Sequence, residues 1–301
     1  MGRIFKISRA VYEGVIEMNK IGLVLEGGGM RGAYTAGALC WLIDHDIEFD
    51  YGVAISAGAV HLCNFIDKNK KNLYDFSVTY VADKRNVGLI PFFKEGSYVG
   101  YDFMFDHILR DTAHFDIENL VNYKTHMEIG VYDLEQGKTN WYLKEDFKND
   151  LQLLKAACTL PIAGKIVHYK GHKFIDGGVT TMVPINRSIE HGNNKHFVII
   201  TKDENYVRKP SGKGMDLALN ALYHPYQHLR EDMKKRTPIY YEEMDKVKEL
   251  CERNEAILLR PTKNLGVSRF KGDHDQLKAL FQLGYQDLED RKEEIFAFLQ
   301  D

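Results

Sequence analysis

The 301-residue sequence is poor in the residues that mark specialised protein classes. Its four cysteines lie far apart and form no CxxC pair, which argues against a zinc site, a redox pair and a disulfide-rich secreted scaffold. We therefore expect reduced, mostly buried thiols. The seven prolines are scattered, and no internal repeat or low-complexity linker is visible, so one continuous globular unit is expected. The cysteines are Cys40, Cys63, Cys158 and Cys251.

The sequence also lacks an excess of charge of either sign. Lys and Arg number 40, and Asp and Glu number 43, giving a net charge of −3. This balance excludes the broad basic field of a non-specific nucleic-acid binder. With 44% hydrophobic and 28% charged residues, the composition is that of a globular chain rather than a disordered segment or a coiled coil.

Long hydrophobic runs are absent as well. No segment approaches the roughly 18 uncharged apolar residues that a transmembrane helix needs. Charges interrupt the N-terminal segment before it reaches signal-peptide length, and Lys6 occupies the Ser/Thr position of the myristoylation pattern. We expect a soluble cytoplasmic protein that can still touch the inner membrane surface peripherally. The oligomeric state stays open.

The first third of the chain alternates between strand-like and helix-like patterns. Apolar runs at Ile21–Leu25 and Tyr51–Ile55 are each followed by small residues and then by a helical pattern, at Ala33–Ile43 and Ala57–Ile66. This alternation predicts a parallel sheet with helices on its faces.

The rest of the chain extends the same pattern. Two hairpins are expected, together with further helices, two strands and a charged amphipathic helix from about His274 to the C-terminus. The sequence thus predicts an α/β fold with a mostly parallel central sheet, helices on both faces and a helical C-terminal extension. The hairpins are Met127–Leu134 with Thr139–Leu143 and Ile166–Tyr169 with Lys173–Ile175, the helices Leu151–Cys158, Met215–Arg236 and Tyr240–Arg253, and the strands Phe197–Thr201 and Ala256–Leu259.

A glycine-rich segment, Glu26–Gly32, separates the first predicted strand from the first helix. Its amides would be exposed at a helix N-terminus, where negative charge is stabilised. Gly27, Gly29 and Gly32 also match the GxGxxG pattern of dinucleotide-binding proteins, whereas the Lys-Ser/Thr pair of a P-loop is missing. A tight turn without a ligand is the third interpretation.

A serine follows the second predicted strand, in Ala54-Ile55-Ser56-Ala57-Gly58. A serine between a strand and a helix of small residues is typical of a nucleophile elbow, whose strained turn exposes the hydroxyl. Ala54 stands where the elbow usually has its first glycine. A helix N-cap is the alternative role for Ser56.

An aspartate ends the second hairpin, in Asp176-Gly177-Gly178. Such an aspartate can cap a turn, bind a metal or act as a base. Metal binding is disfavoured because no cluster at ligand spacing lies nearby, and His168 and His172 only flank a polar turn.

The three motifs together resemble the patatin-like phospholipase family. The resemblance covers about residues 20–200 and rests on Gly27–Gly32, Ser56–Ala59, Ala156–Pro161 and Asp176–Gly178 with the following Pro184. It implies a three-layer αβα domain over residues 20–200, with residues 201–301 as a helical or mixed extension packed on the same domain. That extension carries no motif of a family that we can name.

The resemblance implies a hydrolase of lipid acyl esters, of the phospholipase A or lysophospholipase kind, which needs no cofactor and no metal. Ser56 would be the nucleophile and Asp176 the base, in a dyad without histidine. The oxyanion hole would lie in Gly27, Gly28, Gly29 and Met30, chiefly in the amides of Gly28 and Gly29. Further motif or substrate-binding positions would be Arg31, Gly32, Gly58, Gly177 and Gly178. The partner would be a lipid or phospholipid, not a nucleic acid.

The sequence departs from the family pattern at two positions, and the role of Arg31 has two interpretations. Ala54 replaces the elbow glycine, and Thr181 lies near a position where relatives often carry Asn. Arg31 either binds a substrate phosphate or fixes the loop by pairing with a carboxylate.

Other functions compete with hydrolysis by a dyad. A dinucleotide- or phosphate-binding protein would use the glycine loop with Asp50 as ribose ligand, and a non-catalytic lipid-binding scaffold would keep only the fold. A Ser-acid-His triad would need one of the later histidines, although none lies in a recognisable loop. These histidines are His191, His196, His224, His228 and His274.

Two features of the sequence concern contact with lipid, and each has two interpretations. The aromatic segment Val87–Phe105 is either a mobile flap over an acyl pocket or lipid surface, or a connection packed in the core. Basic clusters at Lys68–Lys71 and Lys234–Arg236 either touch anionic lipid or are solvated surface.

Overall fold

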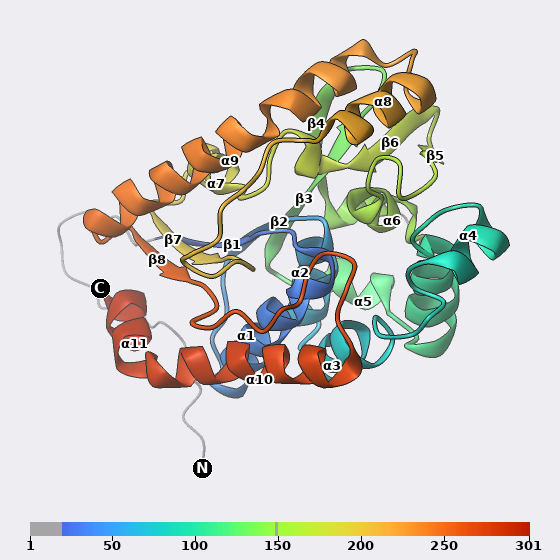
Figure 1. The fold of residues 1–301 in the computed structure, drawn as a ribbon. Coiled ribbons are helices and arrows are strands. Elements are labelled where there is room, and N and C mark those ends of the chain that lie inside the picture. Colours follow the sequence, from blue (N-terminus) through green and yellow to red (C-terminus); the bar gives the residue numbers. More distant parts are fainter. Residues whose placement is uncertain (1–19, 148–149) are drawn as a thin grey trace.

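A computed structural model describes residues 20–147 and 150–301. The prediction for the N-terminal segment therefore lies outside the described residues. In the described part, eight strands form one sheet in the order β5-β6-β3-β2-β1-β7-β8, and β4 pairs with β3 (Figure 1). The strands are β1 Ile21–Leu25, β2 Tyr51–Ile55, β3 His126–Asp133, β4 Lys138–Leu143, β5 Val167–Tyr169, β6 His172–Asp176, β7 Lys195–Ile199 and β8 Ala256–Leu259.

The sheet is mixed but mostly parallel, which confirms the predicted fold class. Strands β3, β2, β1, β7 and β8 run parallel to one another. The antiparallel pairs come from the two predicted hairpins, β3–β4 and β5–β6, and from the pairing of β6 with β3. β8 comes from the C-terminal third of the chain, so this third extends the same sheet.

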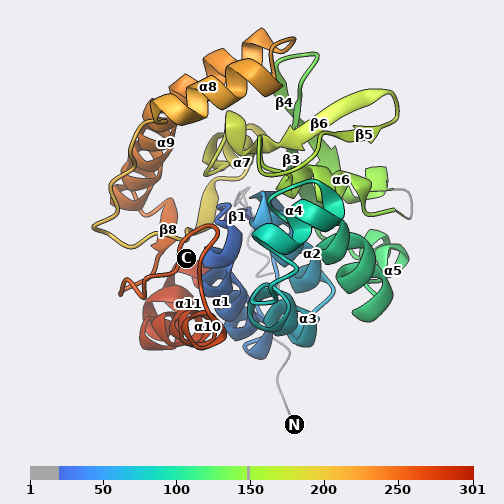
Figure 2. The ribbon, with the colours of Figure 1, turned by 45° about the vertical axis from the view of Figure 1, so that its right-hand side comes forward.

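Alternating side chains along the central strands bury both faces of the sheet. In β1, Leu23 and Leu25 belong to one buried cluster and Val24 to another on the opposite face. Helices α1, α2 and α10 cover the first face, and α7 and α9 cover the second (Figures 1 and 2). Three layers result. The helices are α1 Gly32–Asp44, α2 Ala57–Ile66, α7 Ile185–Glu190, α9 Gln227–Glu252 and α10 His274–Asp290.

Smaller helices complete the molecule. They are α3 Lys70–Tyr74, α4 Leu89–Glu95, α5 Ile117–Asn122, α6 Gln152–Cys158, α8 Lys213–Leu222 and α11 Lys292–Gln300, with π-helical segments at Asp75–Thr79 and Phe103–Thr112. No helix in this part of the chain is long and apolar enough to span a bilayer. All four cysteines are free thiols, two of them buried and two half-buried.

The long helix α9 corrects one predicted boundary. The pattern predicts helices over 215–236 and 240–253, separated near Pro238, but α9 continues through Pro238 and the break lies at residues 223–226. Proline in a helix removes the hydrogen bond to the carbonyl four residues earlier. That carbonyl belongs to Lys234, an exposed residue, so water can bind it.

The register of β3 explains how two distant motifs meet. Ile55, the last residue of β2, pairs with Gly130, and Asp176, the last residue of β6, pairs with the next residue, Val131. Because β4 occupies the other edge of β3, β2 and β6 share one edge and approach each other end to end. Ser56 and Asp176 are therefore neighbours, although 120 positions separate them in the sequence.

Candidate active site

Ser56 occupies the sharp turn between β2 and α2. Its backbone has φ 55° and ψ −131°, a region that residues other than glycine rarely adopt. Its side chain caps no backbone amide, so the N-cap interpretation is not what the structure shows. Ala54 is fully buried in β2, and the turn forms without a glycine at that position. Strain of this kind is typical of a nucleophile elbow.

Two glycines allow the glycine-rich loop to touch this turn. A Cβ added to Gly27 would lie 2.7 Å from the Cβ of Ser56, and one added to Gly58 would lie 2.9 Å from the carbonyl oxygen of Glu26. Any larger residue at either position would push the loop away from Ser56. The predicted motif positions Gly27 and Gly58 thus keep the loop and the serine in contact.

The same loop presents backbone amides beside Ser56. Within the described residues, the amides of Gly28 and Gly29 donate to no other group, and Gly29 has φ +57°. The amide of Met30 is different, because it donates to the carbonyl of Arg269 at 3.2 Å. Of the amides predicted for the oxyanion hole, that of Met30 is therefore not free. The side chain of Met30 instead lines an apolar pocket.

Asp176 is a fully buried carboxylate at the end of β6. Its Oδ1 accepts a hydrogen bond from the amide of Gly178 at 2.7 Å, whereas its buried Oδ2 accepts none from the described residues. Burial raises the pKa of Asp176, and the Ser56 hydroxyl, the Gly178 amide and the Arg236 guanidinium each lower it in part. A Cβ on Gly177 would lie 2.5 Å from the Gly130 oxygen, so this glycine lets β6 close on β3.

Ser56 and Asp176 line one polar cavity of about 340 Å³. The glycine loop forms one wall of this cavity, and four cationic side chains from the C-terminal third form another. The lining residues are Gly27, Gly28, Gly29, Ile55, Ser56, Leu160, Asp176, Gly178, Met182, Lys202, Arg208, Arg236 and Arg269.

Ser56 also lines a second, apolar pocket of about 670 Å³. It shares Gly29, Ser56, Leu160 and Arg269 with the polar cavity, so the serine lies where the two meet. The other lining residues are Met30, Ala33, Ala57, His61, Phe76, Ser77, Val81, Asn86, Val87, Val99, Tyr101, Met104, Phe105, Cys158 and Phe270.

Lys202, which lines the polar cavity, belongs to a buried ion pair. Lys202 donates to Glu26, whose other carboxylate oxygen accepts from the amide and the hydroxyl of Thr201 at 2.7 and 2.9 Å. Burial lowers the pKa of Lys202 to about 8, and the Glu26 carboxylate raises it in part. The carboxylate of Glu26 is thus fully engaged.

The remaining loop positions differ in their surroundings. Arg31 makes no ion pair among the described residues, and its guanidinium lies 5.7 Å from the ring centre of Tyr206. The predicted pairing of Arg31 with a carboxylate is therefore not observed. Gly32 starts α1 against His61, and a Cβ there would lie 2.5 Å from the imidazole Nε2.

Helix α9 contributes two site residues that sequence reasoning missed. Arg236 donates from Nε to the carbonyl of Gly178 at 2.7 Å, and Glu243 accepts from the amides of Met182 and Val183. Burial raises the pKa of Glu243 to about 8. Both residues lie on the helix face that also buries Tyr240. Charged residues within this apolar face were the sequence signal that could have marked them as site residues.

The two basic clusters predicted from the sequence differ in their surroundings. Lys68, Lys70 and Lys71 each pair with a carboxylate. In the second cluster, Arg236 faces the polar cavity.

The segment Val87–Phe105 is neither wholly flap nor wholly core. Val87 and Val99 form a bridge and line the apolar pocket, while α4 between them projects at the molecular surface (Figures 1 and 2). On and beside α4, several large apolar side chains are exposed. They are Leu89, Ile90, Phe92, Phe93 and Tyr98, with Phe93 80% exposed.

The alternative sites are not assembled. Asp50 precedes β2, whereas the glycine loop follows β1, and because these strands are parallel the two lie at opposite ends of the sheet. The prediction of Asp50 as a ribose ligand is therefore wrong. None of the five histidines considered for a triad lines either cavity at Ser56.

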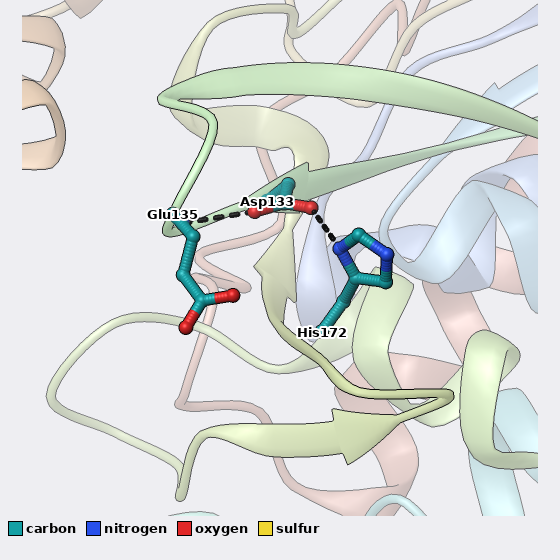
Figure 3. A group of neighbouring side chains, drawn as sticks. All are labelled: Asp133, Glu135 and His172. Atoms are coloured by element: carbon teal, nitrogen blue, oxygen red, sulfur yellow. Dashed lines mark hydrogen bonds and ion pairs between the residues drawn. The ribbon is translucent and has the colours of Figure 1, made fainter.

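One carboxylate–histidine cluster lies elsewhere. Asp133, Glu135 and His172 bring their side chains within 4.8 Å of one another across the β3–β4 turn and β6 (Figure 3). No sequence pattern predicts this cluster, because only the fold brings His172 to Asp133. Both oxygens of Asp133 are already used, by the amides of Glu135 and Gln136 and by His172 Nδ1 at 2.8 Å. These bonds fasten the turn to the neighbouring strand.

Both parts of the chain have matches among known proteins. Residues 23–188 match the patatin-like phospholipase family, and residues 226–300 match a domain of unknown function (DUF6363). The chain is 27% identical over 194 residues to the probable lipid hydrolase 463L of Invertebrate iridescent virus 6, and 24% identical over 190 residues to the uncharacterized protein YjjU of Escherichia coli K12. The alignments cover 58% and 60% of this chain but only 65% and 52% of those relatives.

A solved structure shares the fold. VipD from Legionella pneumophila superimposes with a TM-score of 0.51 at 11% identity, over 90% of this chain and 66% of that one.

Proposed function

The chain belongs to the patatin-like phospholipase family, and we propose that it hydrolyses acyl esters of lipids with Ser56 as nucleophile and Asp176 as general base. The observation that carries the proposal is the placement of a strained serine, a buried carboxylate and two free amides around one cavity. A dinucleotide-binding function would leave the first two without a role.

The proposed reaction has two steps. In the first, Asp176 takes the proton of the Ser56 hydroxyl as its oxygen attacks the ester carbonyl, and the amides of Gly28 and Gly29 bind the resulting oxyanion. The alcohol leaves with a proton from Asp176. In the second, water attacks the acyl-Ser56 ester as Asp176 takes its proton, and Asp176 returns that proton to the Ser56 oxygen as the fatty acid leaves.

The apolar pocket suits the acyl chain of such a substrate. It starts at Ser56 and continues between side chains such as Met104 and Phe105. Burying a methylene group there stabilises the bound chain by ~0.8 kcal/mol. Four free thiols fit a reducing compartment, so we place the reaction in the cytoplasm.

The first test uses a fluorophosphonate probe and a short-chain p-nitrophenyl ester. We expect the probe to label Ser56, and we expect Ser56→Ala and Asp176→Asn each to lower turnover by about a thousandfold or more. Exposed positions provide the matched controls Ser211→Ala and Asp275→Asn, which should keep activity. Turnover that survives Ser56→Ala and Asp176→Asn would refute the dyad.

We further propose that α4 touches the membrane from which the substrate is drawn. Phe92 and Phe93 are 53% and 80% exposed, and the flanking Val87 and Val99 line the apolar pocket. An exposed apolar surface next to an acyl pocket is favourable at a lipid interface.

The measurement for this contact is sedimentation with phospholipid vesicles. Phe92→Ser with Phe93→Ser should lower vesicle binding by about tenfold, while hydrolysis of a water-soluble ester stays the same. Leu217→Ser, at an exposed leucine on α8, is the matched control. Equal vesicle binding by the α4 variant and the wild type would exclude this contact.

A further inference from the structure

The polar cavity at Ser56 gathers more positive charge than the proposed hydrolysis requires. Arg208, Arg236 and Arg269 line it, together with Lys202. Lys202 is paired with Glu26, but among the described residues none of the three arginines forms an ion pair with a carboxylate. Asp176 is the one acidic side chain in the lining. The cavity is therefore strongly cationic.

The arginines lie close to one another, and some of their N–H donors have no hydrogen-bond partner among the described residues. Burial, and next the charges of Arg269 and Arg208, lower the pKa of Arg236 to about 9. The Nε of Arg208 is buried without a hydrogen-bond partner, and its guanidinium lies 5.3 Å from the ring centre of Tyr240. Arg31, just outside the lining, also has a buried Nε without a partner. Unpaired buried donors and like charges are costly unless an anion joins them.

The positions of the cationic cavity and the apolar pocket indicate which kind of ligand would fill both. The two cavities meet at Ser56, so an ester held at the serine would extend an acyl chain into one and its alcohol portion into the other. Guanidinium groups bind phosphate oxygens in pairs through parallel N–H donors, more strongly than neutral groups do.

We propose that Arg208, Arg236 and Arg269 are specificity-determining residues that bind the phosphate of a glycerophospholipid headgroup, so that this chain prefers a phosphate-bearing ester over a neutral one. This inference rests on the proposed hydrolysis and names the residues that select its substrate. All three arginines lie outside the matched family region, and Arg236 and Arg269 lie in the segment that matches the domain of unknown function. That segment thereby acquires a role in substrate selection.

Binding to the Ser56→Ala protein tests the subsite without turnover. Calorimetry would compare monodecanoylglycerol phosphate, monodecanoylglycerol and inorganic phosphate. We expect the phosphate ester to bind about tenfold to a hundredfold more tightly than the neutral ester. Equal affinity for the two esters overturns the proposal. So does inorganic phosphate binding as tightly as the phosphate ester, because the site would then serve the free ion.

Substitutions of the arginines then locate the effect. Arg208→Gln and Arg269→Gln should each weaken binding of the phosphate ester about tenfold, with a smaller effect on the neutral ester. Arg110→Gln, at a 60% exposed side chain, is the matched control. Arg236→Lys accompanies Arg236→Gln because it keeps the buried charge, and circular dichroism checks that each variant folds.

Turnover separates this inference from the proposed function. If the arginine variants lower kcat for both esters equally, with KM unchanged, the guanidinium groups stabilise the oxyanion and the headgroup proposal is wrong. If wild-type Ser56 is not labelled by the fluorophosphonate, the hydrolase proposal fails, while the binding comparison still decides whether the cavity takes a phosphate ester.

Discussion

The two cavities that meet at Ser56 differ in chemistry and in origin. The apolar pocket is built mainly by residues of the matched family region, including the segment Val87–Phe105. All four cations of the polar cavity come from the chain beyond residue 200. The motif-bearing region therefore supplies the candidate reacting groups and the apolar side, whereas the C-terminal third supplies the charged side.

The two sides also differ in what stabilises them. Burial of the apolar side chains around the pocket stabilises the folded state, because it removes them from water. Charges in the polar cavity lose hydration, and they need partners to offset that cost. The Glu26–Lys202 pair is such a partnership, and it lies where the glycine loop and the C-terminal third of the chain meet. Breaking the polar side should therefore cost more stability than altering the apolar side.

The largest expected effect follows from Lys202→Met. This change leaves Glu26 buried without its cation, and we expect the free energy of unfolding to fall by about 3–5 kcal/mol. Urea denaturation measures the change. The double variant Glu26→Gln with Lys202→Met should recover part of the loss, because no unpaired charge remains. A single variant within about 1 kcal/mol of the wild type would contradict a paired role for Lys202.

An intermediate effect is expected on the apolar side. Val81 is half-buried and lines the pocket, so Val81→Phe should fill space that a long acyl chain occupies. We expect the ratio of kcat/KM for a long-chain to a short-chain p-nitrophenyl ester to fall by about tenfold. Leu217→Phe on α8 is the matched control. An unchanged ratio would place the acyl chain elsewhere.

The smallest effect concerns pH. Burial raises the pKa of Asp176, and a protonated Asp176 cannot act as a base, so activity should fall as the pH drops through this raised pKa. Arg236 lowers that pKa, and Arg236→Gln should therefore move the acidic limb of the profile of kcat/KM to higher pH. The neutral ester is the substrate here, since its binding needs no arginine. An acidic limb that stays in place, or moves to lower pH, would contradict the effect of Arg236 on the pKa of Asp176.

Much of the architecture was predictable because local patterns carry it. The pattern at Ala57–Ile66 gives the bounds of α2, and the two hairpins appear where alternating runs flank short turns. The strained serine could be expected because small residues surround it. The roles of Ser56 and Asp176 stay predictions until the substitutions are measured.

Other features could not be predicted locally. Arg236 lies in a basic stretch that looks solvated in the sequence, and only the packing of α9 against the site turns it inward. Asp50 satisfied a sequence spacing, yet the parallel arrangement of β1 and β2 puts it at the wrong end of the sheet. His172 reaches Asp133 through the pairing of β6 with β3.

The sequence by itself predicted most strands, several helices, the family and the candidate residues Ser56 and Asp176, since periodicity and short motifs are properties of neighbouring positions. The tertiary structure alone decided which of these residues meet. β3 pairs with β2 and β6 along one edge, which brings Ser56 to Asp176, and the C-terminal third folds back to place Arg208, Arg236 and Arg269 beside them. The physical reason is that burial and strand pairing act between positions far apart in the chain, where no local pattern records them.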